Sequence, residues 1–228
     1  MKSMLTKIML TTAFLSILPI IAFGYTYNLG TTFSNTVNPD GSGPWLTINI
    51  TDAGANTVTL DIQGNMVDMP NTDPQKINDI YLNFSNTSLL SNLNFTFVSG
   101  QFGAESISLS SNAYKADGVG GYFDILMQWR SNRPIDGTDH IVYSITAAGL
   151  TAAMFNDTCV NYGTPPGPLH AAAHLQNAGF DSFGRFDSTW IGDIPDDPPN
   201  PVPEPGTLVL LGAGFLGLAA YGRKRASR

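Results

Sequence analysis

Trp45-Leu-Thr-Ile-Asn-Ile50 and Thr57-Val-Thr-Leu-Asp-Ile62 are two alternating runs of apolar and polar residues, separated by Asp52-Ala-Gly-Ala-Asn56. An apolar residue at every second position is the period of a β-strand with one buried face. The segment between the runs holds the Asp, Gly and Asn that favour turns. The stretch therefore predicts a β-hairpin in which each strand has one apolar and one polar face.

Similar short runs continue along the chain on both sides of Gly/Asn/Asp/Pro-rich segments. Further strands are expected at 77–84, 93–98, 106–109, 122–129 and 140–145. The run 122–129 is the most continuously apolar, which predicts a central strand. One turn of helix is expected at 150–155, and no segment of the body sustains a helical period over ten residues. The fold class that follows is all-β: a single, jelly-roll-like β-sandwich.

The segment 169–176, Leu-His-Ala-Ala-Ala-His-Leu-Gln, has two interpretations. As a helix it would place His170 and His174 on one face, at the spacing of a two-histidine metal site, but the Glu of a His-Glu-x-x-His motif is missing. As a strand it would direct Ala171, Ala173 and Leu175 into the core. We favour the strand, because three prolines crowd the front of the segment.

Charge is distributed unevenly along the chain. Of its 18 acidic residues only Glu204 lies outside residues 25–203, whereas six of the 11 basic residues lie at the two ends, which leaves five basic against 17 acidic residues in the body. A body this acidic repels nucleic-acid phosphates and anionic lipid headgroups. We therefore expect no nucleic-acid partner; the charge suits divalent cations or simply solubility.

Cys159 is the only cysteine, so the chain forms no intramolecular disulfide. A body of this size has a core large enough to be stable without one. We expect Cys159 to be a small buried residue. The alternatives are a reactive thiol or an intermolecular bridge.

The N-terminus has the three parts of a secretory signal peptide. Lys2 and Lys7 precede an apolar stretch of 15 residues, and Ala22 and Gly24 supply small residues at the −3 and −1 positions of a cleavage site. We predict that residues 1–24 are a signal peptide cleaved after Gly24. An uncleaved anchor is the alternative.

Composition changes abruptly after Asp193. The stretch 194–205 holds six prolines in 12 residues, which predicts an extended stalk of roughly 35–40 Å at about 3.1 Å per residue. The uncharged run 207–221 would give only about 22 Å of helix, short for a membrane of roughly 30 Å. The basic tail Arg223-Lys224-Arg225 would stay on the cytoplasmic side.

Pro203-Glu204-Pro205, the short Gly-rich run and the basic tail, in this order, resemble the PEP-CTERM sorting signal of Gram-negative bacteria. The resemblance implies that an exosortase, a membrane protease-transpeptidase, recognises the three motif residues and moves the domain to the envelope or extracellular matrix. Together with the composition, it leads us to divide the chain into a signal peptide (1–24), a sandwich ectodomain (25–193), a Pro-rich linker (194–202) and the sorting signal (203–228) with its transmembrane helix at 207–221.

A second, weaker resemblance covers about 45 residues before the stalk. Ala173-His-Leu-Gln176 and Trp190-Ile-Gly192 are similar to an Ala-His-x-Gln segment and a Trp-Ile-Gly segment near the end of many PEP-CTERM ectodomains. Between the two segments the chain departs from that pattern, because three phenylalanines replace much of the usual glycine. The resemblance implies only a structural role for His174 and Gln176.

Motifs for catalysis are missing from the sequence. There is no Gly-x-Ser-x-Gly, and Glu105 is the only Glu of the body, whereas glycoside hydrolysis needs two well-placed carboxyl groups. Asp136 and Asp139 share one turn. Aspartates also recur every six residues near the end of the body; they are weak Ca²⁺ candidates, and solvated turn aspartates are the alternative. The recurring residues are Asp181, Asp187 and Asp193.

These observations predict a non-enzymatic, exported surface or matrix protein associated with exopolysaccharide or biofilm. Its partners would be an exosortase, the membrane before processing, and exopolysaccharide. The alternative is a carbohydrate- or Ca²⁺-binding module that uses a tryptophan as a stacking platform; the candidates are Trp45, Trp129 and Trp190. A polysaccharide hydrolase is a third, weaker interpretation. No cofactor is expected other than Ca²⁺.

Overall fold

The hairpin that the sequence predicts is present in a computed structural model of the chain. Strands β3 (Leu46–Gly54) and β4 (Thr57–Gly64) pair antiparallel, with Ile48 opposite Ile62. Both isoleucines are fully buried, while the alternating polar residues of these strands face outward. The structure describes residues 23–33, 37–67, 74–118, 120–163 and 167–194, all within one unit that spans Ala22–Pro203.

The hairpin is the middle of a five-stranded antiparallel sheet. Its order is β1-β3-β4-β10-β6, with β1 at Gly24–Leu29, β10 at His140–Thr146 and β6 at Asn94–Ser99. Strands β6 and β10 lie close to the ranges expected from their alternating pattern. Strand β1 was not expected, because Tyr25-Thr-Tyr27 follows the signal-like segment without a clear turn before it.

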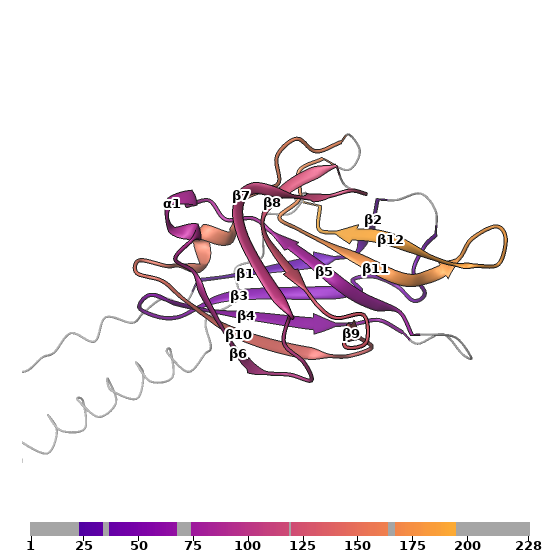
Figure 1. The fold of residues 1–228 in the computed structure, drawn as a ribbon, viewed down its shortest axis with the longest axis horizontal. Helices are drawn as coiled ribbons and strands as arrows, with labels where there is room; N and C mark the ends of the chain where they lie inside the picture. The colour runs from indigo at the N-terminus through magenta and orange to yellow at the C-terminus, as the bar shows by residue number, and fades with distance from the viewer. Residues whose placement is uncertain (1–22, 34–36, 68–73, 119, 164–166, 195–228) are drawn as a thin grey trace, which may run out of the picture. The chain divides into compact units, whose positions relative to one another are not determined.

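The second sheet has the order β2-β12-β11-β5-β8-β7, with β9 (Ile135–Asp136) also paired to β5 (Figure 1). The bounds are β2 Thr31–Thr32, β12 Phe186–Gly192, β11 Ala171–Phe180, β5 Lys76–Leu82, β8 Gly121–Gln128 and β7 Ser106–Ala116. A central strand was predicted at 122–129; β8 is a strand there and is paired on both sides, by β5 and β7, but it lies next to the edge strand and not at the middle of the sheet. The strand interpretation of segment 169–176 is also correct, and the helical one is wrong.

One hydrophobic core fills the space between the two sheets. Ile48 and Ile62 from the first sheet join Ile80, Met127 and Ala173 from the second. Helix is almost absent from the described residues: α1 spans Thr87–Leu90, and the expected turn at 150–155 is a 3-10 helix, Ala152–Phe155. The all-β, two-sheet prediction is therefore confirmed, while the finer jelly-roll-like connectivity stays a prediction.

A second, smaller apolar cluster covers the outer face of the second sheet. Tyr81, Phe123 and Ala172 pack there with Cys159 and Leu169. The segment that carries Cys159 lies across the sheet, because the Cys159 N–H donates to the Leu169 carbonyl and Val160 pairs with Tyr122. Strands β8 and β11 are therefore covered on both faces, which explains why their sequences are apolar at consecutive positions.

Two segments differ from the sequence expectation. Strand β7 continues to Ala116, well beyond the expected end at residue 109, through an irregularity between Leu109 and Tyr114. Asn112 takes a left-handed conformation there (φ 48°), and its N–H donates to the Asp124 carboxylate at 2.7 Å. The stretch 177–192 forms the end of β11 and the whole of β12, a hairpin that its phenylalanine-rich composition did not reveal.

Candidate functional site

The residues assigned to sorting lie outside the described residues. This holds for Ala22, the motif, the basic tail and the expected helix at 207–221. Gly24 is described: it is the first residue of β1, opposite Thr51. In the described part of the chain, no helix has the length and apolarity needed to cross a bilayer.

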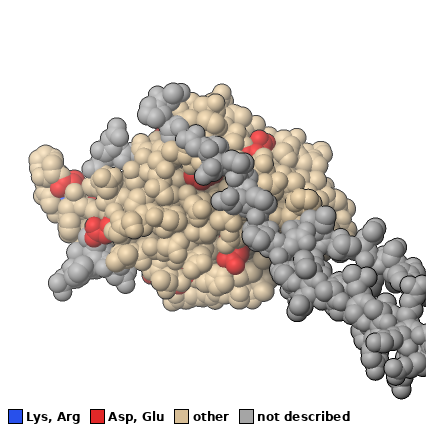
Figure 2. Space-filling model, turned by 180° about the vertical axis from the view of Figure 1, so that it is seen from behind, with Lys and Arg blue, Asp and Glu red and all other residues tan. Residues whose placement is uncertain are grey.

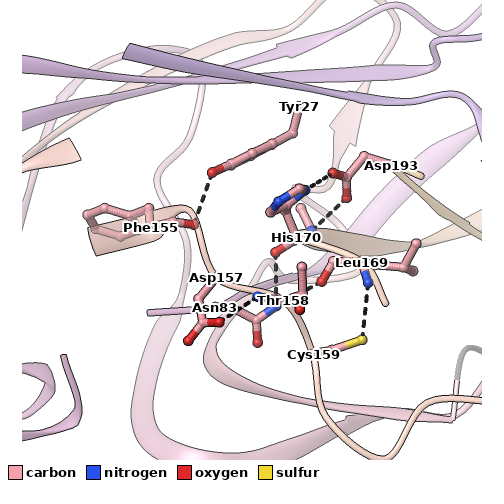
Figure 3. A network of polar contacts seen from close by, with 10 residues as sticks. Tyr27, Asn83, Phe155, Asp157, Thr158, Cys159, Leu169, His170 and Asp193 are labelled. Atoms are coloured by element: carbon pink, nitrogen blue, oxygen red, sulfur yellow. Dashed lines mark hydrogen bonds and ion pairs between the residues drawn. The ribbon is translucent and has the colours of Figure 1, made fainter. Parts of the chain in front are cut away.

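A network of buried polar contacts lies where the described body ends (Figure 3). Asp193 follows β12, and its two carboxyl oxygens contact different partners: one lies 2.7 Å from His170 Nδ1, and the other accepts from the Ala171 N–H at 2.8 Å. Both side chains are about nine-tenths buried. This pair fastens the end of the sandwich to the start of β11.

A face of the His170 ring contacts the first sheet. Tyr27 of β1 stacks on His170 with ring centroids 5.1 Å apart and an interplanar angle of 12°. The Tyr27 hydroxyl donates to the Phe155 carbonyl at 2.9 Å. Burial, followed by the nearby Asp193, raises the pKa of Tyr27 far above its ordinary value, so this hydroxyl keeps its proton.

Two further residues complete this region. The Asn83 amide donates to the Leu169 and His170 carbonyls, at 3.1 and 3.0 Å. The Cys159 thiol accepts from the Leu169 N–H at 3.4 Å, and its pKa is raised by burial. Cys159 is buried, which confirms the interpretation made from the sequence. A buried thiol with a raised pKa is a poor nucleophile.

An aspartate bonded to a histidine is also two-thirds of a hydrolytic triad. A triad needs a nucleophile on the other ring nitrogen. The hydrogen bond that the structure gives for the His170 ring joins it to Asp193. This bond holds the residue after β12 against the residue before β11, a structural role that needs no nucleophile.

The three aspartates named as weak Ca²⁺ candidates have separate surroundings. Asp181 lies at the tip of the β11–β12 hairpin, where its carboxylate accepts from the N–H groups of Phe183 and Arg185. Asp187 accepts from the Ser188 N–H, and Asp193 is bonded to His170. Strand β12 separates Asp187 from Asp193 by about 20 Å at roughly 3.3 Å per residue. Within the described residues, no three His, Cys, Asp or Glu side chains gather as a metal would require.

The other carboxylates that the sequence singled out also have protein partners. Asp139 accepts from the Asp136 N–H at 3.2 Å within their shared turn. Glu105 forms a surface ion pair with Arg130 at 2.8 Å. Glycoside hydrolysis uses two facing carboxyl groups, whereas Glu105 is paired with a cation.

The three tryptophans differ in accessibility. Trp45 and Trp129 belong to the core and are buried, with their indole N–H groups donating to the Asp40 and Phe102 carbonyls. They therefore present no open ring for a ligand to stack on. Trp190 is half-buried and stacks on the His174 ring with centroids 4.9 Å apart.

The contact between His174 and Trp190 joins two segments that the sequence singled out. In the pairing of β11 with β12, His174 lies opposite Trp190, Ala173 opposite Ile191 and Ala172 opposite Gly192. The Ala-His-x-Gln and Trp-Ile-Gly segments are therefore neighbouring strands. Their residues pack against each other, which fits the structural role expected for His174.

Stability should decrease in mild acid through His174. Burial lowers its pKa below the ordinary 6.5, and the nearby Asp79 opposes this only partly. The unfolded chain therefore binds a proton near pH 6.5 that the folded chain binds only at lower pH, so acidification through this range favours unfolding. The loss of stability is measured by urea unfolding of the wild type and of His174→Phe. Each is unfolded at neutral pH and again at about one pH unit below 6.5. We expect a smaller loss in the variant, which keeps a stacked ring; equal losses would contradict this assignment.

A hollow of about 380 Å³ lies between strands β6 and β7, and we call it the β6–β7 hollow. Phe95 and Phe97 of β6, Tyr143 of β10 and Ile107 of β7 line its apolar part, and Glu105 lies at its rim. Its volume falls in the range of small-molecule sites, about 300–1,000 Å³. The alternating pattern of β6 predicted a strand, but nothing in the sequence indicated that its aromatic side chains would stay partly exposed.

Charge on the surface is sparse. Seen from behind in Figure 2, the described surface carries isolated Asp and Glu residues and no cluster of Lys or Arg. The outward residues of the five-stranded sheet are mainly hydroxyl and amide side chains: Thr51, Thr59, Ser144 and Thr96 follow one another across four strands. No basic surface for a polyanion is visible on this face.

Comparison with protein families identifies the end of the chain. Residues 201–225 match the family model described as the PEP-CTERM protein-sorting motif. The chain carries a PEP-CTERM sorting signal. The matched range contains the Pro-Glu-Pro motif, the apolar run and the basic tail, so the resemblance seen in the sequence is confirmed. Comparison with curated proteins gives no match, and comparison with solved structures gives none.

The PEP-CTERM signal implies recognition by an exosortase. It supports exosortase-dependent export of the chain as a surface protein, with membrane-associated sorting in the Gram-negative cell envelope. The match covers only the C-terminal end, so it assigns nothing to the sandwich. The separate roles of Pro203, Glu204 and Pro205, and cleavage after Gly24, stay predictions.

Proposed function

We propose that the chain is a non-enzymatic protein of the extracellular matrix, which an exosortase delivers to the surface and which there associates with exopolysaccharide. The observation that carries the proposal is the sorting signal at residues 201–225, joined to a sandwich whose described part ends just after Asp193. A folded, acidic cargo followed by a signal for surface delivery is the arrangement expected of a structural or binding protein of the matrix.

The surroundings of the polar residues support the non-enzymatic part of the proposal. Asp193 and His170 are engaged with each other and with the backbone, and Glu105 is engaged with Arg130. Catalytic groups usually face a cleft and a substrate. Asp193 and His170 instead make their contacts between strands, and Glu105, which lines the β6–β7 hollow, is paired with Arg130.

Cell fractionation tests this proposal. Cells producing the wild-type chain are separated into cytoplasm, membranes, matrix and medium, and the chain is followed by immunoblotting of its folded body. We expect the protein in the matrix fraction, shortened at its C-terminus and released from matrix by enzymatic digestion of the polysaccharide. An intact chain confined to the cytoplasm, or matrix retention that polysaccharide digestion leaves unchanged, would contradict the proposal.

A second candidate function is carbohydrate binding by the sandwich itself. Trp45 and Trp129 do not favour it, because both are buried. The β6–β7 hollow does favour it, since it combines partly exposed aromatic side chains with polar groups at its rim. A Ca²⁺-binding module has no comparable support in the described residues.

A further inference from the structure

The two lateral sides of the sandwich are built differently. On one side the chain runs directly from β1, the margin of the first sheet, through Gly30 into β2, the margin of the second. On the other side the margins are β6 and β7, which do not pair with each other (Figure 1). The core therefore reaches the surface at the β6–β7 side, and the β6–β7 hollow lies there.

The apolar part of the hollow is accessible although it is continuous with the core. Phe97 is 43% exposed, and its ring meets Tyr143 edge-on with centroids 5.7 Å apart. Phe95 also meets Tyr143, at 6.4 Å. An aromatic ring left this open at the mouth of a core costs hydration free energy unless something covers it.

A buried polar atom also lines the hollow. Tyr143 is almost fully buried, and its hydroxyl oxygen accepts from the Ala104 N–H at 2.5 Å. A hydroxyl donates as well as accepts, so an acceptor oxygen placed in the hollow would meet the Tyr143 O–H as a donor.

The rim of the hollow supplies polar groups of both kinds. Glu105 accepts a hydrogen bond from Arg130, with 2.8 Å between Oε1 and Nε. Ser106 follows it at the start of β7, with its hydroxyl 3.5 Å from Gln128 Oε1. Gly103 leaves room between Phe97 and Tyr143, because a Cβ there would lie 3.1 Å from each.

We propose that the β6–β7 hollow binds a sugar residue of a neutral polysaccharide. A sugar ring presents an apolar C–H face that stacks on an aromatic ring, and hydroxyl oxygens that accept and donate hydrogen bonds. Phe97 supplies the stacking surface, Tyr143 the buried donor and Glu105 an acceptor at the rim. The body carries five basic against 17 acidic residues, so a neutral chain meets less repulsion than an anionic one. This inference rests on the proposed matrix association.

Strands β6 and β7 also have unpaired backbone edges, to which an extended peptide or a second copy of the chain would pair. The aromatic lining and the Tyr143 hydroxyl favour the sugar, because strand pairing uses the backbone and leaves both unused. Pairing with protein is therefore an outcome that the experiment must separate from sugar binding.

The test uses the exported protein isolated from its host and a panel of purified polysaccharides: laminarin, hydroxyethyl cellulose, dextran and galactomannan as neutral chains, and alginate as an anionic one. Phe97→Ala removes the stacking surface at an exposed position. Val98→Ala is the matched control, since Val98 is the next residue of β6, is 58% exposed and does not line the hollow. Tyr143→Phe removes only the hydroxyl. Calorimetry measures binding, thermal unfolding checks the fold, and light scattering measures the oligomeric state.

We expect at least one neutral polysaccharide to bind, with affinity lowered about tenfold or more by Phe97→Ala and unchanged by Val98→Ala. Tyr143→Phe should weaken binding while the protein stays folded. Binding of no neutral chain, equal binding by Phe97→Ala and the wild type, or a dimer that Phe97→Ala dissociates would each overturn the inference. If the wild type and the Phe97→Ala variant are retained equally in the matrix fraction, the hollow is not the binding site. The proposed function would then still stand.

Discussion

Replacing Pro203, Glu204 and Pro205 together by alanine is expected to abolish sorting. The matched signal implies recognition by an exosortase, and these three residues are its predicted recognition element. Loss of a few contacts worth about 1.4 kcal/mol each lowers processing by roughly tenfold per contact. We expect the uncut chain to accumulate in the membrane fraction and the surface pool to fall by at least ~10-fold, measured by immunoblotting of cell fractions.

A matched control separates the motif from the stalk. Pro198→Ala/Pro199→Ala also removes prolines from the same Pro-rich stretch, but it lies outside the matched range 201–225. It should leave the surface pool close to wild type. An equal loss in the control would mean that stalk stiffness is what the exosortase needs, and normal sorting of the triple variant would refute the assigned motif residues.

Asp193→Ala is expected to destabilise the sandwich strongly. It removes the acceptor of the Ala171 N–H and the partner of His170 Nδ1, both buried. Leaving such groups unsatisfied costs about 3 kcal/mol. For a body of this size the midpoint of thermal unfolding should fall by roughly 6–12 °C, which calorimetry or circular dichroism measures.

Two further variants give this prediction its controls. Asp117→Ala removes an exposed carboxylate paired with Lys115, and it should change stability by less than about 0.5 kcal/mol. His170→Phe keeps a ring against Tyr27 but removes Nδ1, so it should cost less than Asp193→Ala. If the effects of Asp193→Ala and His170→Phe simply add in the double mutant, the two side chains are not coupled and the assigned interaction is wrong.

Alternation along single strands was predictable, because it reflects the two faces that every strand has. The hairpin β3–β4 and the strand at Ala173-His-Leu-Gln176 were expected on this basis and are present. Strand β8 was expected from its continuous apolar run and is present too. The length of β7 was not predictable, because the irregularity at Asn112 depends on Asp124 of the next strand. A contact between two strands does not change the alternation of apolar and polar residues in either of them.

The candidate site shows the same limit. The sequence named His170 as one of two histidines and Asp193 as one of three aspartates, each in a different context. Folding pairs one member of each set, 23 residues apart, and leaves His174 against Trp190. Spacing along the chain suggested a two-histidine site, but His170 precedes β11 and His174 lies within it, so the two rings reach different neighbours.

The sorting signal was readable from the sequence alone, because it is a short linear pattern that needs no folded body around it. The sequence also determined the all-β class, because the apolar period of a strand is local. Only the tertiary structure decided which polar groups are buried and which aromatic side chains stay open. Aromatic side chains stay open where β6 and β7 form the unpaired margins of the two packed sheets. Asp193 is buried because folding brings it to His170 at the end of the body.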